Sequence, residues 1–114
     1  MVEIFAINDS DININIIFNN DANTVYARRR SNNGAADSTD TSQPQLEVYG
    51  NTSQTRFQYF MILNTSDQEK LVLGSNNQNT AGASTAPDRT EWVCKWSNTS
   101  DAITRIDVFN TGSG

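Results

Sequence analysis

Short alternating runs of apolar and polar residues, separated by asparagine-rich turns, constrain the fold of this chain most strongly. In residues 12–18, isoleucine or phenylalanine takes every second position, and asparagine fills two of the positions between them. A period of two is typical of a β-strand with one buried face. The tetrapeptide Asn-X-Ser-Asp occurs three times, beginning at Asn8, Asn64 and Asn98, and a close variant begins at Asn51. Asparagine and aspartate close tight turns, so the repeated tetrapeptide predicts a series of hairpins.

Eight strands and no helix of normal length are predicted on this basis. Their ranges are residues 2–7, 12–18, 24–28, 46–49, 56–63, 70–74, 90–96 and 103–109. Many short strands with turns between them predict an all-β fold, a single antiparallel β-sandwich domain over residues 1–114. A closed β-barrel is the alternative.

Three segments carry more specific expectations. Residues 56–63 are apolar or aromatic on both faces, which predicts a central strand buried on both sides. The polar stretches Ser31–Gln45 and Ser75–Pro87 are predicted to be long loops.

Composition excludes several classes of function. The net charge of −5 argues against binding to nucleic acid or to an anionic membrane surface. No apolar run is long enough for membrane insertion, and the first residues lack a signal peptide, so a cytoplasmic location is expected. Without histidine, the usual catalytic triads and zinc sites are ruled out, and we expect no enzyme activity, metal or cofactor. The lone thiol, Cys94, is expected to be a small buried hydrophobe.

The stretch most suggestive of a binding site is residues 88–96, which holds both tryptophans and the cysteine at alternate positions. A sugar site needs a flat ring and a few fixed amide, carboxylate or guanidinium groups, and this stretch and the polar run before it supply both. In this hypothesis Trp92 stacks on the sugar, while Asp88 and Arg89 contact its hydroxyls. The predicted ligand-binding residues are Asn76, Asn77, Asp88, Arg89, Glu91 and Trp92.

Two alternatives accompany this site. Both tryptophans can instead belong to the core. Tyr26 and Arg28, which share one face of a predicted strand, form a second candidate surface.

In overall character the chain resembles the small fruiting-body lectins of mushrooms. It shares their all-β pattern, acidic balance, scarcity of cysteine and abundance of asparagine, serine and threonine. The resemblance implies a fungal-type cytoplasmic lectin that binds cell-surface-type glycans containing galactose, N-acetylgalactosamine or fucose. A homodimer is expected, because linked sites raise avidity. A structural or capsid-like β-sandwich subunit is the alternative function, followed by a small hydrolase.

Overall fold

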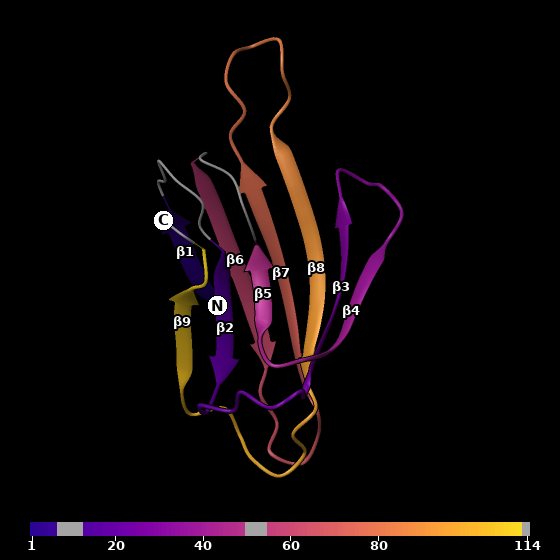
Figure 1. Cartoon of the computed structure of the whole chain (residues 1–114), viewed down its shortest axis with the longest axis vertical. Coiled ribbons are helices and arrows are strands. Elements are labelled where there is room, and N and C mark those ends of the chain that lie inside the picture. The colour runs from indigo at the N-terminus through magenta and orange to yellow at the C-terminus, as the bar shows by residue number, and fades with distance from the viewer. Residues whose placement is uncertain (7–12, 50–54, 113–114) are drawn as a thin grey trace.

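The computed structural model describes residues 1–6, 13–49 and 55–112, which form nine β-strands and no helix (Figure 1). The strands are β1 (Val2–Ala6), β2 (Ile14–Phe18), β3 (Tyr26–Asn32), β4 (Ser38–Gln43), β5 (Leu46–Tyr49), β6 (Arg56–Leu63), β7 (Lys70–Gln78), β8 (Asp88–Trp96) and β9 (Ile106–Asn110). Every pair of neighbouring strands is antiparallel. The expected all-β antiparallel fold is therefore confirmed. Because the described residues contain no helix, none of them forms a helix that could cross a membrane.

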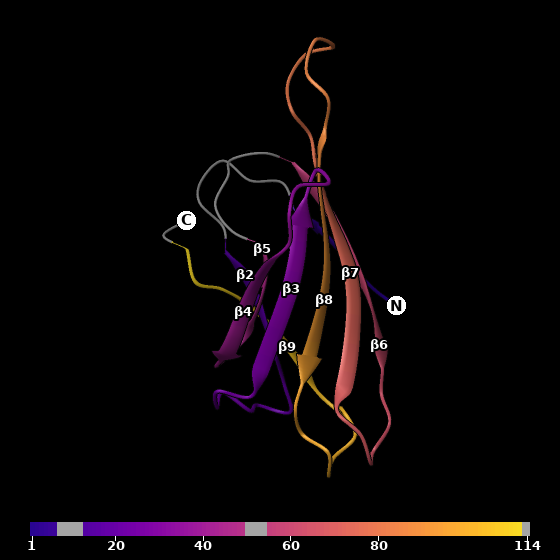
Figure 2. The ribbon, with the colours of Figure 1, turned by 90° about the vertical axis from the view of Figure 1, so that its right-hand side faces the viewer.

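The strands form two sheets of unequal size. The larger sheet has the order β1-β6-β7-β8-β3-β4, and the smaller has the order β5-β2-β9. Each sheet keeps two edge strands, so the chain does not form the alternative closed barrel. The small sheet lies against one face of the large sheet, as Figures 1 and 2 show. We call that face of the large sheet the inner face and the opposite face the outer face.

The core lies between the two sheets and follows the alternation of the sequence. In β2, Ile14, Ile16 and Phe18 are at most 6% exposed, which confirms the predicted apolar face of this strand. The predicted position of Ile12 on that face lies outside the described residues. The buried apolar residues are Ile14, Ile16, Phe18, Tyr26, Leu46, Val48, Phe60, Val72, Trp92, Cys94 and Trp96.

The predicted loop at Ser31–Gln45 is wrong, because residues 38–43 form strand β4 against β3. The turn between these strands uses Asn33 and Gly34, which have positive φ angles of 51° and 77°. Cross-strand contacts then hold the hairpin, including Arg29 Nη1 to Asp37 Oδ2 at 3.2 Å and Arg30 Nε to Ser38 Oγ at 3.1 Å. Side-chain pairing therefore makes a strand from a polar sequence with little β propensity.

The predicted loop at Ser75–Pro87 begins too early. Residues 75–78 belong to β7 and pair with β6 on one side and β8 on the other. Two neighbouring strands satisfy the backbone of these polar residues, which overrides their preference for turns. Only residues 79–87 connect β7 to β8, and this connection projects beyond the sheets in Figure 1.

Strand β6 departs from expectation in its burial. Three of its inward residues are buried and the fourth, Ile62, is half-buried, but on the outer face Phe57, Met61 and Leu63 are 43%, 50% and 56% exposed. The prediction of burial on both sides is therefore wrong for the isolated chain, because no described strand covers the outer face (Figure 2).

Candidate functional site

Strand alternation divides the predicted ligand-binding residues between the two faces of the large sheet. Asn77, Arg89 and Glu91 are exposed, whereas Asn76 and Trp92 are buried. Asp88 is half-buried at the start of β8, where its carboxylate accepts a hydrogen bond from Asn33 Nδ2 at 2.8 Å. The structure therefore brings together only the exposed members of the predicted set.

Trp92 is a core residue. It is 5% exposed, and its ring centroid lies 6.1 Å from that of Phe60. The indole also covers Gly74 so closely that a Cβ at this position would overlap the ring. The alternative in which Trp92 belongs to the core is therefore the one that the structure shows, and no open indole face is left for a sugar.

Asn76 is also interior, so it does not take the predicted ligand-binding role. It is 1% exposed and pairs in register with Gln58 of β6, which is equally buried. Among the described residues, Asn76 Oδ1, both polar side-chain atoms of Gln58 and Trp92 Nε1 have no hydrogen-bond partner. They belong to a larger set of buried polar side chains that also includes Asn15, Arg28 and Lys70.

The second candidate surface, Tyr26 with Arg28, is likewise buried. The Tyr26 hydroxyl accepts a hydrogen bond from Phe18 N at 2.9 Å and donates one to Asp21 O at 2.8 Å. Burial raises the pKa of Tyr26 to about 12. The residue therefore joins the sheets as a neutral phenol.

Arg28 makes a similar connection between the sheets. Its side chain is 5% exposed and contacts Asp40 Oδ2 at 2.7 Å and Glu47 Oε2 at 3.4 Å. It also donates to the Glu47 carbonyl. Because β5 carries Glu47 and β4 carries Asp40, this guanidinium links the two sheets and is not available to a ligand.

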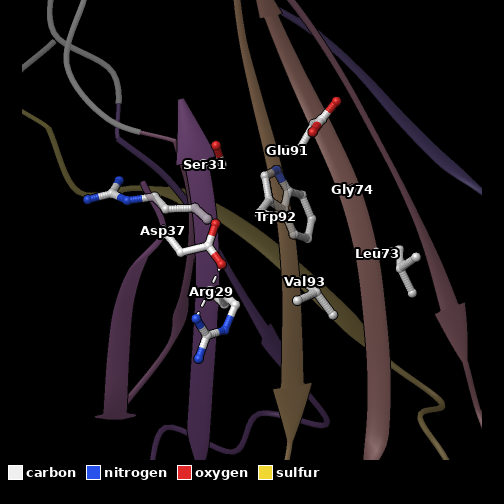
Figure 3. Close-up of a pocket in the computed structure, with 9 residues that line it drawn as sticks. Arg29, Ser31, Asp37, Leu73, Gly74, Glu91, Trp92 and Val93 are labelled. Atoms are coloured by element: carbon white, nitrogen blue, oxygen red, sulfur yellow. Dashed lines mark hydrogen bonds and ion pairs between the residues drawn. The ribbon is translucent and has the colours of Figure 1, made fainter. Parts of the chain in front are cut away.

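An open groove on the outer face replaces both predicted surfaces as the candidate site (Figure 3). It has a volume of about 340 Å³ and runs across β3, β8 and β7. Leu73, 47% exposed, and the half-buried Val93 give it an apolar floor. The groove is lined by Arg29, Arg30, Ser31, Asp37, Leu73, Gly74, Glu91, Trp92 and Val93.

Two ion pairs border this groove. Arg29 Nη1 lies 3.2 Å from Asp37 Oδ2, and Arg89 Nε lies 3.9 Å from Glu91 Oε1. All four side chains are at least half exposed. The border therefore presents hydrogen-bond donors and acceptors as two ion pairs, and Arg30, which lines the groove and donates to Ser38 Oγ at 3.1 Å, adds a third guanidinium group.

Of the groove residues, sequence reasoning identified Glu91 and Trp92 and missed the other seven: Arg29, Arg30, Ser31, Asp37, Leu73, Gly74 and Val93. Asp37 was missed because it was placed in a loop. The available signal was the run of three arginines followed by Asp37 and Asp40, a spacing that permits opposite-charge pairs across a hairpin. Arg29 faces Asp37 and Arg28 faces Asp40, so the arginine run forms no continuous basic surface.

Comparison with protein-family models, curated proteins and solved structures gave no match. No family therefore assigns roles to the groove residues. Within the described ranges, no three His, Cys, Asp or Glu side chains group as metal ligands would. Cys94 is buried as expected, and burial raises the pKa of its thiol to about 12, so the unreactive protonated form is favoured.

Proposed function

We propose that this protein binds neutral glycans in the outer groove. The observation that carries the proposal is the two ion pairs that border an apolar floor. Carboxylates accept hydrogen bonds from sugar hydroxyls and guanidinium groups donate to them, while an apolar floor suits the C–H face of a sugar ring.

The ion pairs also distinguish between ligand classes. A phosphate or nucleic acid site would need unpaired positive charge, whereas two of the three guanidinium groups at this groove, those of Arg29 and Arg89, each lie beside a carboxylate. An uncharged ligand with many hydroxyls leaves both ion pairs in place. Its hydroxyls can donate hydrogen bonds to the carboxylates and accept hydrogen bonds from the guanidinium groups. Leu73 and Val93 take the role that the sequence hypothesis gave to Trp92. Glycans containing galactose, N-acetylgalactosamine or fucose remain the proposed ligands.

A glycan array probed with the purified chain tests the proposal, followed by titration of the best ligand against variants. Asp37→Ala and Glu91→Ala should each weaken binding roughly tenfold, because each removes a hydrogen-bonding carboxylate from the groove. Glu69→Ala is the matched control, since Glu69 forms a comparable surface pair with Lys95 at 2.8 Å but does not line the groove. Failure to bind any arrayed glycan, or equal losses in all three variants, would reject the proposal.

A structural subunit is the second candidate function. It is favoured by the exposed apolar side chains on the outer face of β6 and β7, which suit contact with another protein.

A further inference from the structure

The outer face of β6 and β7 carries a patch of large apolar side chains that take no part in the core. Five large apolar side chains of this patch are between 40% and 56% exposed. They alternate along the two strands and so point to the same side of the sheet. We call them the β6–β7 patch: Phe57, Met61, Leu63, Leu71 and Leu73.

The patch is continuous across the strands. Met61 pairs in register with Leu73, and Leu63 pairs with Leu71, so these four side chains are cross-strand neighbours. At the other end of β6, the rings of Phe57 and Tyr59 lie 6.1 Å apart. No described strand covers this side of the sheet, as Figure 2 shows.

We propose that a second copy of this chain covers the β6–β7 patch, with the two large sheets packed face to face around a two-fold axis. Such packing is an ordinary arrangement of sheets, with an intersheet distance of about 10 Å. A two-fold axis places the same patch on both sides of the interface, as in most homodimers.

The area of the patch fits a dimer. Side chains of this size expose on the order of 100 Å² each at the observed fractions, so the five together offer about 500 Å². Tyr59 and the aliphatic parts of neighbouring polar side chains extend this towards the roughly 800 Å² per partner of a stable interface.

The charges around the patch also favour a second copy over a partner protein that is strongly basic or strongly acidic. The chain carries a net charge of −5, which opposes self-association in general. Beside the patch, however, Lys95 pairs with Glu69 at 2.8 Å and Arg89 pairs with Glu91 at 3.9 Å. Glu3 of β1, in register with Tyr59, adds a single exposed carboxylate to this face. A strongly basic or acidic partner would therefore find little charge to match here, whereas two copies can meet with their ion pairs intact.

The sequence of β6 supports the same conclusion. An apolar pattern on both faces is typical of a strand buried on both sides, yet the folded monomer buries only one face of β6. A second copy on the outer face resolves this discrepancy.

Sedimentation of the purified chain, from roughly 1 to 100 μM, tests the inference. The expected result is a concentration-dependent species of twice the monomer mass of 12.6 kDa. Met61→Glu should raise the dissociation constant at least a hundredfold, because it places a charge at the centre of the interface. Its folding is checked by circular dichroism, and Leu71→Glu serves as a second variant if Met61→Glu does not fold.

Val108→Glu is the matched control. Val108 is 50% exposed, as Met61 is, but it lies on β9 in the other sheet. It should leave the dimer unchanged. A wild-type chain that stays monomeric throughout, or equal weakening by Met61→Glu and Val108→Glu, would overturn the inference. Leu73 belongs to both surfaces, so a second copy would cover part of the groove floor. Met61 does not line the groove, so Met61→Glu leaves the groove residues unchanged, and glycan binding by this variant separates the two proposals.

Discussion

Asparagine side chains form hydrogen bonds between segments that lie outside the paired strands. Asn19, which has a positive φ of 51°, accepts hydrogen bonds from Thr104 N at 2.9 Å and Arg105 N at 3.0 Å. The side-chain amide of Asn64 bonds to Ile103 with both polar atoms: Nδ2 donates to the Ile103 carbonyl, and Oδ1 accepts from Ile103 N. Asn98 closes its own turn by accepting from Ser100 N and Asp101 N, but this turn joins β8 to β9 of the other sheet, so the hairpin predicted here is wrong. The expected turns at Asn8 and Asn51 lie outside the described residues.

At the residue scale, Trp92→Ala tests whether the indole is structural. The change should lower the free energy of unfolding by about 3–5 kcal/mol, because it removes a large buried ring and leaves a cavity beside Phe60 and Gly74. Urea denaturation followed by circular dichroism measures the loss. A loss below about 1 kcal/mol would show that the ring is not part of the core.

Tyr26 gives the protein a specific alkaline sensitivity. The pKa of Tyr26 is raised to about 12 by burial, whereas the pKa of a tyrosine in the unfolded chain is near its ordinary value of 10.0. The folded state therefore holds the proton more tightly, and this contribution to stability is complete below pH 10 and is lost as the pH rises from about 10 to 12.

Tyr26→Phe should remove that contribution. At neutral pH the variant should be less stable by about 1–3 kcal/mol, because two buried hydrogen bonds are lost. The stability difference between the two proteins should shrink between pH 10 and 12 in denaturation curves. A difference that is constant over this range would contradict the assigned pKa.

At the scale of elements, the hairpin of β3 and β4 depends on Gly34. Its φ of 77° is unfavourable for other residues, so Gly34→Ala should lower the free energy of unfolding by about 1–2 kcal/mol. It should also speed amide hydrogen exchange in β3 and β4. Gly82→Ala is the control, since Gly82 has a φ of 87° but lies in the connection between β7 and β8. Faster exchange of β4 in both variants, or in neither, would contradict this role of the turn.

Elements with a clear apolar alternation could be predicted from the sequence, and elements held by polar pairing could not. Residues 56–63 were predicted with the bounds that β6 has, because apolar side chains mark both faces of this strand. Strand β4 was missed because its ion pairs become apparent only when Arg28 and Arg29 are placed opposite Asp40 and Asp37.

The same limit applies to the candidate site. Residues Asp88–Trp96 were chosen as a candidate site because they hold many polar and aromatic side chains. In strand β8, however, successive side chains point to opposite faces of the sheet. Trp92 therefore lies on the inner face and Glu91 on the outer face. The composition of the segment does not show which of its residues share a face.

At the scale of the whole molecule, the unequal sheets leave one face of the large sheet without a partner. The inner face holds the core, with Trp92, Tyr26 and Arg28 as structural residues. The outer face carries the groove and, next to it, the β6–β7 patch, with Leu73 belonging to both. We infer that the inner face stabilises the fold and the outer face makes the contacts with ligand and second copy.

Oxidation of Met61 by hydrogen peroxide, read by mass spectrometry at increasing protein concentration, tests this central inference most directly. Met61 is 50% exposed in the monomer and lies within the β6–β7 patch. Its oxidation should slow as dimers form, and it should not slow in Leu71→Glu, in which the interface carries an unpaired charge. An oxidation rate of Met61 that is independent of concentration in the wild-type protein would contradict the account.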